Sequence, residues 1–295
     1  MSPAPAVSVA VRARNEAGYV PRIIAALGRQ TLPPLEVVYV DHLSTDGTPE
    51  MVKRHPGARV VGFGDEPWSY ARHTNRALEV CRGEIVACLV GHAVPIGDDW
   101  LERLVAPFAD SQVAGVYGRQ VPNPGCNLLE VRRLEESFGP EPLRQRDIPF
   151  FSTSHCAVRR SVWERHRFDE TLGFGEDAVW AAEVQRHGYV VCYEPAARAL
   201  HSHDAGPALL LRRAYQEGGG LARLYPRSAA YLLRKTAARW LKGTRRDYAL
   251  FRRERAAAWW YPFAAGFELV ESLVLHAGIV YGWVRPKADP RRAPR

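Results

Sequence analysis

A short apolar segment and the polar loop that follows it, residues 36–48, constrain the fold more than any other part of the sequence. Residues 37–40 (Val-Val-Tyr-Val) form a continuous apolar run, which is typical of a strand buried on both faces. The run ends at Asp41, and the loop adds Ser44 and Asp46 before the next helix begins. Because ligands of parallel α/β sheets bind at the carboxyl ends of the strands, this stretch predicts a ligand site. Turn formation and helix capping alone can also place Asp, Ser and Gly in such a loop.

Apolar strands alternate with amphipathic helices over about the first 110 residues, which predicts an α/β fold with a parallel, doubly wound sheet. Strands are expected at residues 7–11, 36–41, 59–63 and 84–90, and helices at 20–27, at 49–55, from 69 and from 98. The later chain is less regular, with strands expected at 113–119, 150–158 and 189–193, and helices at 128–138 and 176–188. The absence of G-x-G-x-x-G after the first strand and of G-x-x-x-x-G-K-[ST] anywhere argues against a dinucleotide dehydrogenase and a P-loop enzyme.

The net charge of +8 is unevenly distributed along the chain. Residues 1–204 carry a net charge of −4, whereas residues 205–295 carry +12. The C-terminal part therefore predicts an anionic partner, either a membrane surface or nucleic acid. The five cysteines form no C-x-x-C pair, and the N-terminus has no secretory pattern. Both features predict a reduced, cytoplasmic protein without a cysteine zinc site.

Three loops that follow predicted parallel strands bring polar side chains to one edge of the sheet. The first loop carries Arg14, Asn15 and Glu16, the second begins at Asp41, and the third carries His92. A carboxylate at the end of a strand, such as that of Asp41, can accept hydrogen bonds from a nucleobase or a ribose. The pattern therefore indicates a nucleotide site at this edge.

Several segments, taken in order, carry a family resemblance over roughly residues 7–215. VSVAVRARNE, EVVYVDHLSTDGT, GEIVACLVGHAVP-x-x-DDWL and FDE-x-x-x-x-x-ED together resemble the family 2 inverting glycosyltransferases, and YEP-x-x-x-x-LHSHD resembles the rhamnosyltransferase-type bacterial members. The resemblance implies a GT-A fold, which is a Rossmann-like mixed sheet. It also implies a nucleoside-diphosphate sugar donor and transfer with inversion at the anomeric carbon.

The resemblance also implies roles for residues of the nucleotide and metal sites. The predicted nucleotide-binding residues are Arg14, Glu16, Asp41, Ser44, Asp46, Arg72 and Asn75. His92 stands where the family usually carries the last carboxylate of an Asp-x-Asp metal motif, and His203 matches a late family histidine. Two imidazoles suit Mn²⁺ better than Mg²⁺, so we expect a divalent ion, with Mn²⁺ favoured. The alternatives are an enzyme without metal and a His92 that only caps its loop.

Glu176 and Asp177 match the acidic pair that supplies the catalytic base in this family. An inverting transfer needs one carboxylate that removes the proton of the attacking hydroxyl, and we predict Asp177 for this role, with Glu176 positioning sugar or acceptor. The alternative is that both acids only complement the dipole of a helix start. His155 is predicted to contact the acceptor or, with equal weight, to pack in the core.

The C-terminal residues 211–295 are predicted to form a basic helical extension to a GT-A domain of residues 1–210. An apolar run that ends at Val284 is interrupted by Glu268, Glu271 and His276, which argues against a simple membrane-spanning helix. Tryptophans between arginines suit a helix that lies in the lipid headgroup region. The alternative is a helix packed on the catalytic domain or on a partner in a homodimer.

Together these features predict a cytoplasmic glycosyltransferase, peripheral at the inner face of the cell membrane, that extends a glycan or lipid-linked acceptor. Nucleic acid is not expected as a partner, because no binding motif accompanies the basic charge. The alternative function is a catalytically silent GT-A protein that binds a nucleotide sugar as a scaffold or regulator.

Overall fold

The computed structural model describes residues 5–64, 66–203 and 205–284, and the chain divides into two compact units. The first unit comprises Met1–Cys126, Leu134–Glu170 and Glu176–Ser202, and the second comprises Asn127–Arg133, Thr171–Gly175 and His203–Arg295. The division is therefore not a single cut in the sequence, and the boundary expected at residue 210 falls within helix α8 (Pro207–Leu221). Asp204 of the predicted histidine motif and residues 285–295 of the predicted extension lie outside the described residues.

The first unit contains a nine-stranded sheet whose first half has the predicted parallel arrangement. Its neighbouring strands in order are β3 (Ala58–Gly62), β2 (Glu36–Asp41), β1 (Val7–Ala13) and β4 (Ile85–Val90). All three pairings among them are parallel. The near-continuous burial of β1, β2 and β4 explains their apolar sequences, whereas β3 has no buried residue.

The second half of the sheet is mixed, as the family resemblance implied. Strand β8 (His155–Arg159) runs antiparallel to both β4 and β6 (Val113–Val121), while β9 (Val190–Leu200) runs parallel to β6. Two short strands, β5 (Val94–Ile96) and β7 (Leu143–Gln145), pair antiparallel with β9. Strand β9 extends beyond the predicted end at residue 193, and its register shifts between Gly118 and Arg119 of β6. Because of this shift, some residues of β9 are not paired with a residue of β6. One of them is Pro195, which has no backbone N–H to donate to a neighbouring strand.

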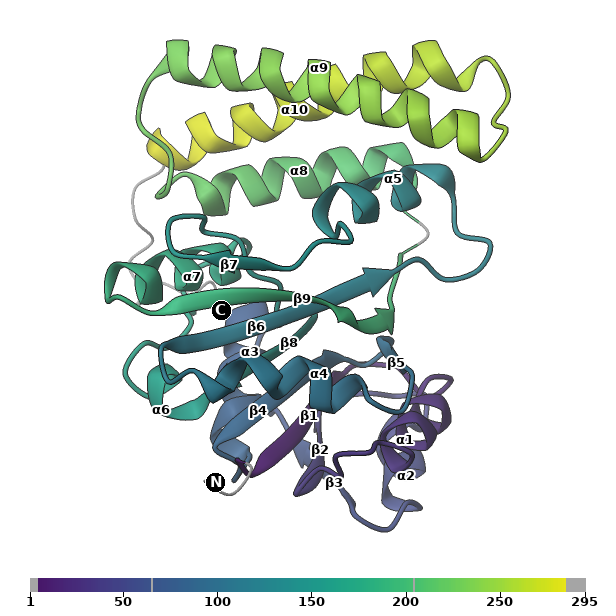
Figure 1. Ribbon diagram of the computed structural model, residues 1–295, viewed down its shortest axis with the longest axis vertical. Coiled ribbons are helices and arrows are strands. Elements are labelled where there is room, and N and C mark those ends of the chain that lie inside the picture. Colours follow the sequence, from purple (N-terminus) through teal and green to yellow (C-terminus); the bar gives the residue numbers. More distant parts are fainter. Residues whose placement is uncertain (1–4, 65, 204, 285–295) are drawn as a thin grey trace. The chain divides into compact units, whose positions relative to one another are not determined.

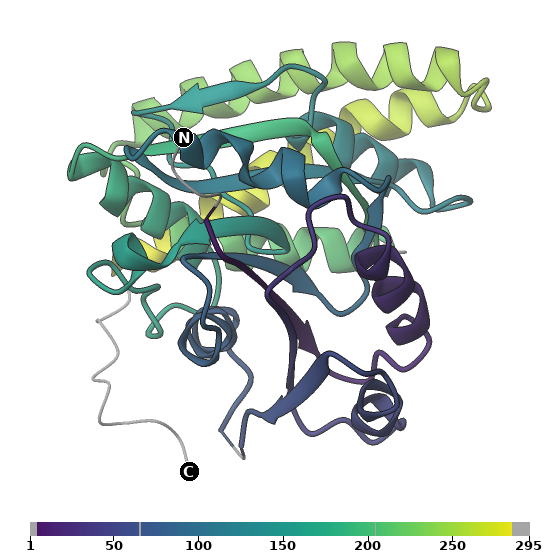
Figure 2. The same ribbon diagram turned by 60° about the horizontal axis from the view of Figure 1, so that its bottom comes forward.

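Helices cover both faces of the sheet. One face packs against α1 (Val20–Gly28), α2 (Thr48–Lys53), α4 (Trp100–Val105) and the 3₁₀ turn η1 (Ala106–Ala109). The other face packs against α3 (Tyr70–Val80), α6 (Arg160–Trp163) and α7 (Glu176–Arg186). Figure 2 shows α3 on the opposite side of β1 and β2 from α1 and α2. Alternate residues of β1 enter the two cores, with Val9 in the first and Ala10 in the second.

The second unit is helical. It contains the first residues of α5 (Leu128–Ser137), together with α8, α9 (Ala229–Arg253) and α10 (Trp260–Val284), as Figure 1 shows. Glycines let α8 and α10 approach closely: a Cβ at Gly218 would lie 2.0 Å from the Leu275 carbonyl oxygen, and one at Gly278 would lie 2.1 Å from that of Tyr215. No side chain fits at such contacts.

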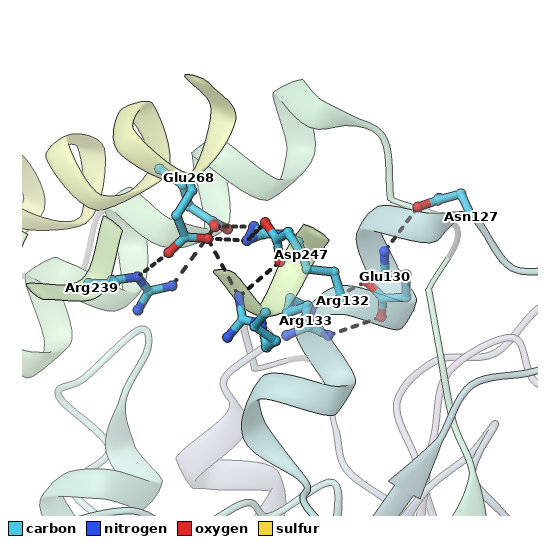
Figure 3. Close-up of polar contacts among 9 residues, drawn as sticks. Asn127, Glu130, Arg132, Arg133, Arg239, Asp247 and Glu268 are labelled. Carbon is cyan, nitrogen blue, oxygen red and sulfur yellow. Dashed lines mark hydrogen bonds and ion pairs between the residues drawn. The ribbon is translucent and has the colours of Figure 1, made fainter. Parts of the chain in front are cut away.

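A buried network of charges crosses this helical unit (Figure 3). Arg132 of α5 pairs with Glu268 and Glu271 of α10, and lies 3.7 Å from Asp247 of α9. Arg239 also pairs with Glu268, at 3.4 Å. The acidic interruptions of the apolar C-terminal run thus face the inside of the unit. Among the described residues one helix, α10, is long and apolar enough to cross a membrane, and half of its apolar window is buried.

Candidate active site

The predicted site residues of three loops leave the sheet at one edge. Strand β1 lies between β2 and β4, with Ala13 opposite Asp41 and Arg12 opposite Val90 (Figure 1). The carboxyl ends of the three strands are therefore level. The loops that carry Glu16 and His92 leave this edge beside Asp41, as the alternation of strands and helices predicted.

Hydrogen bonds tie the loop after β1 to the loop after β2. Asp41 accepts hydrogen bonds from the hydroxyl and the backbone N–H of Ser44, at 2.6 and 3.1 Å. The Ser44 hydroxyl in turn accepts the Asn15 N–H at 2.8 Å, while Asp46 accepts the Ala17 N–H at 2.9 Å. Burial alone would raise the pKa of Asp46, but hydrogen bonds from Thr48 and Ala17 lower it overall. The loops are thus held by the polar residues predicted to bind a nucleotide, and Arg14 is exposed beside them.

Arg72 and Asn75 lie on α3 but in different environments. Asn75 is buried: its amide nitrogen donates to Glu170 at 2.8 Å, and its amide oxygen accepts the Trp163 indole N–H at 2.9 Å. Through these bonds Asn75 holds Trp163 and Glu170, which precede α7 in the chain, in position. Arg72 is partly exposed and pairs with Glu66 at 2.9 Å and with Glu170 at 3.5 Å. Only Arg72 of the two presents its side chain at the surface.

His92 is positioned by Glu16 and by a histidine that the sequence reasoning missed. Nδ1 of His92 lies 2.7 Å from the Glu16 carboxylate, and its ring stacks on that of His201, with centroids 4.9 Å apart. Gly91 permits this, because a Cβ there would lie 2.6 Å from Cγ of Glu16. Nδ1 of His201 lies 2.6 Å from the amide oxygen of Gln120.

These contacts assign the protonated nitrogen of each ring. A carboxylate and an amide oxygen only accept hydrogen bonds, so in the neutral rings of His92 and His201 Nδ1 carries the hydrogen and Nε2 carries the lone pair. Metal-binding histidines commonly have this arrangement, in which one nitrogen donates to a carboxylate or carbonyl and the other ligates the ion. The residues present therefore fit a divalent ion at Nε2. His203, the other predicted ligand, follows His201 by two residues and belongs to the second unit, where its N–H donates to Glu130 at 3.1 Å. The alternation His-x-His in the sequence was the signal that could have revealed His201.

The acidic pair begins α7, as predicted. Glu176 is buried, and burial raises the pKa of its carboxyl group, an effect opposed by hydrogen bonding and by the charge of Arg12. Arg12 of β1 is itself buried and donates to the Thr74 hydroxyl and the Thr153 carbonyl. Asp177 is the more exposed acid of the pair. The sequence offered only an arginine at the end of an apolar strand as a sign of Arg12.

His155 is fully buried in β8. Its Nε2 accepts the Trp100 indole N–H at 2.6 Å, and desolvation lowers its pKa to about 3. A Cβ at Gly118 would lie 2.3 Å from the imidazole ring. These surroundings agree with the alternative that His155 packs in the core. Its contact with an acceptor stays a prediction.

A group of rings lies directly after Asp41 and was not predicted. His42 Nε2 lies 2.9 Å from the Glu66 carbonyl oxygen, and its ring is 4.9 Å from that of His73. Two further rings stack or pack on His73, that of Phe63 at 3.8 Å and that of Trp68 at 4.0 Å. Desolvation lowers the pKa of His73 to about 4, so the ring is neutral at pH 7. The group forms an aromatic wall that begins directly after Asp41 in the chain.

Two curated relatives are bacterial enzymes of O-antigen synthesis by name. The O-antigen chain rhamnosyltransferase WbaN of Salmonella anatum is 28% identical over 204 residues, which cover 65% of this chain and 64% of WbaN. RfbN of Salmonella typhimurium, also named an O-antigen chain rhamnosyltransferase, is 25% identical over 223 residues, 72% of this chain and 71% of RfbN. The match thus spans less than two thirds of the length of WbaN.

A solved structure shares the fold. The mannosyltransferase PcManGT from Pyrobaculum calidifontis, in complex with GDP-Man and Mn²⁺, superimposes with a TM-score of 0.66 at 23% identity, covering 96% of this chain and 88% of PcManGT. This likeness confirms the predicted GT-A fold. The sequence model of glycosyl transferase family 2 matches residues 8–167, which is more than half of the chain. Motif order, sheet topology and this match agree, and the protein belongs to glycosyl transferase family 2.

Proposed function

We propose that the protein transfers a sugar from a nucleoside-diphosphate sugar to a hydroxyl of a glycan or lipid-linked acceptor, with inversion at the anomeric carbon. The observation that carries the proposal is the convergence of Asp41 with the Glu16–His92–His201 array on one edge of a GT-A sheet. The names of WbaN and RfbN support a deoxyhexose such as rhamnose as the sugar.

The nucleotide part of the donor lies along the edge formed by β1 and β2 in this proposal. Asp41 accepts hydrogen bonds from the base or the ribose, and the aromatic wall that includes Trp68 offers a ring face for stacking. Trp68 is 39% exposed, so its ring is accessible to a planar ligand. Base–aromatic stacking contributes about 1–3 kcal/mol in proteins that bind single-stranded nucleic acids.

The donor diphosphate lies at the histidines. His92 and His201 would hold a divalent ion, with Mn²⁺ favoured over Mg²⁺ because the ligands are imidazoles. Such an ion supplies positive charge that stabilises the diphosphate as it leaves. The mannosyltransferase PcManGT, which shares the fold, was solved with Mn²⁺. Glu16 and Gln120 act through His92 and His201, because they fix which ring nitrogen holds the lone pair.

Asp177 is the general base of the proposed reaction. The acceptor oxygen attacks the anomeric carbon on the face opposite the diphosphate, the bond from that carbon to the diphosphate oxygen breaks, and the acceptor proton passes to Asp177. The partly exposed position of Asp177 suits contact with an acceptor, whereas the burial of Glu176 beside Arg12 suits a positioning role. General base catalysis contributes about 10²–10⁴-fold to such rates.

The helical unit provides the membrane contact in this proposal, with the enzyme at the cytoplasmic face. The polar residues of α10 are turned inward, whereas its outward side chains are large and apolar. These exposed residues are Leu269, Val270, Leu273, Val280, Tyr281 and Val284. With the net charge of +12 on residues 205–295, the combination suits an anionic bilayer surface. The double variant Val270→Ser, Leu273→Ser should lose binding to anionic vesicles in sedimentation, and unchanged binding would contradict the membrane role.

A donor screen tests the function. Purified protein is incubated with a panel of nucleoside-diphosphate sugars, an extract of lipid-linked glycans and Mn²⁺, and release of nucleoside diphosphate is measured. Asp177→Asn should lower turnover by at least about 100-fold with nearly unchanged nucleotide affinity. The matched control Asp98→Asn, at an exposed acid that pairs with the exposed Arg29, should retain full turnover. Nucleotide-sugar binding without release by the wild type would favour the silent scaffold instead.

A further inference from the structure

A second group of metal-ligating side chains lies in the first unit, apart from the residues of the candidate active site. It consists of His166, just after α6, and Glu183 and His187 at the end of α7. A ring nitrogen of each histidine and a carboxylate oxygen of Glu183 lie within 4.8 Å of one another. Because Glu183 and His187 follow Asp177 along α7 by about two and three helical turns and a helix rises 1.5 Å per residue, this group is roughly 9–15 Å along the helix axis from Asp177.

The chain holds these three side chains together by short-range contacts. His187 and Glu183 are one helical turn apart, and the two imidazole rings have centroids 4.4 Å apart. The indole N–H of Trp180 donates to the His166 carbonyl oxygen at 2.7 Å, which fixes the backbone of His166 against α7. The three side chains therefore come from two backbone segments, the one that carries His166 and the end of α7, and the Trp180 hydrogen bond fixes the distance between these segments.

The hydrogen bond of His187 prepares its ring for a metal. Nδ1 of His187 lies 2.9 Å from the Glu183 carbonyl oxygen, which only accepts, so Nδ1 carries the hydrogen and Nε2 carries the lone pair. This donation from one ring nitrogen to a backbone carbonyl is the usual partner arrangement of metal-bound histidines.

The positive charge of the neighbouring Arg186 does not prevent Glu183 from binding a metal ion. Arg186 pairs with the other carboxylate oxygen of Glu183, but its side chain is 68% exposed and such i,i+3 surface pairs are weak. The 4.8 Å separation exceeds the roughly 3.4 Å between ligands of a tetrahedral zinc ion with bonds of about 2.1 Å. The side chains of Glu183 and His187 are 38% and 50% exposed, so rotation about their χ angles can shorten it.

We propose that His166, Glu183 and His187 bind a divalent transition-metal ion of the zinc class. Two imidazoles and one carboxylate are a recurrent ligand set for zinc, with water in the remaining position, and they are poor ligands for Mg²⁺ or Ca²⁺. The bound ion joins the end of α6 to the end of α7, the helix that begins with Glu176 and Asp177. The ion binds independently of donor and acceptor. The zinc site can therefore be tested separately from the proposed function.

Zinc titration of the full-length protein tests the proposal. Protein freed of metal with a chelator is titrated with Zn²⁺ by calorimetry, without nucleotide. His187→Ala and Glu183→Gln should each weaken one zinc-binding event by at least about 10-fold. The matched control His55→Ala removes a histidine outside both groups, and His92→Ala removes one from the candidate active site. Both controls should keep the event, and circular dichroism of all four variants checks that they are folded.

Two results would overturn the assignment. One is a zinc isotherm that is the same in His187→Ala, Glu183→Gln and wild type, or a wild type that binds no zinc. The other is loss of all zinc binding in His92→Ala with retention in the two α7 variants, since the ion would then lie at the active-site histidines. Co²⁺ substitution gives an independent readout, because its visible absorption should change in Glu183→Gln and not in His55→Ala.

Discussion

Replacement of Arg132 by methionine should strongly destabilise the helical unit. The Arg132 side chain is 2% exposed and is the cation shared by Glu268, Glu271 and Asp247, whose side chains are 0%, 7% and 0% exposed. Methionine keeps much of the length of arginine but removes the charge and all five N–H donors. Glu268 and Glu271 would then keep the partly exposed Arg239, and Asp247 and Glu268 would keep the partly exposed Arg246.

The expected loss in the free energy of unfolding is about 3–5 kcal/mol, which is the usual cost of removing one partner from a buried ion pair. Arg239 and Arg246 are 34% and 23% exposed and lie 3.4 and 3.6 Å from Glu268, so they compensate only in part. Urea unfolding followed by far-ultraviolet circular dichroism measures the loss, because this unit is helical. Arg103→Met is the control, since Arg103 forms an exposed i,i+4 pair with Asp99 and should cost no more than about 0.5 kcal/mol.

A second mutation separates charge from packing. If the cost comes from uncompensated carboxylates, Glu268→Gln added to Arg132→Met should restore part of the stability, and the two effects should not add. A loss below about 1 kcal/mol in Arg132→Met, similar to that of the control, would refute the reasoning. A strictly additive double variant would assign the loss to packing alone.

Three further predictions follow from other contacts. Burial raises the pKa of Asp247 to about 6, so the folded state holds the proton of this carboxyl group more tightly than the unfolded state does. The free energy of unfolding should therefore fall as pH rises from about 4 to 6. Asp247→Asn should flatten this slope in urea titrations at several pH values. Gly278→Ala should cost about 1–3 kcal/mol because its Cβ would enter the backbone of α8, whereas Gly266→Ala, with no atom within 4 Å of its Cβ, should be neutral or stabilising in the same thermal melts. Glu16→Ala removes the acceptor that orients His92 and should weaken Mn²⁺ binding about 10–100-fold in calorimetry with nucleoside diphosphate present; equal affinity would remove Glu16 from that role.

Local sequence patterns were sufficient for the parallel half of the sheet and for the edge that carries the site. Three of its four strands, β1, β2 and β4, are buried, so each of these appears as an apolar run whatever it pairs with. The level ends of β1, β2 and β4 then follow from the rule that parallel strands present their carboxyl ends to the same edge. Asp41, Glu16 and His92 were predicted for this edge on that ground, and the structure brings them there.

The same patterns did not reveal which distant residues would meet. Asn75 reads as a polar residue on a helix, but its side chain is buried by contacts with Trp163 and Glu170. Glu268 reads as an interruption in an apolar helix, and it is buried because Arg132 lies opposite it. A polar residue at a given position has the same local signature whether it faces water or a distant partner.

The sequence by itself determined the family, the class of fold and the order along the chain of the strands that carry the site. These properties depend on short segments and on the order in which the segments follow one another. Tertiary structure decided that His201 stacks on His92, that Arg12 lies near Glu176, and that the first residues of α5 and the segment before α7 belong to the helical unit. These features depend on pairing between residues far apart in the chain. Such pairing is fixed by the packing of the whole fold, and no local periodicity records it.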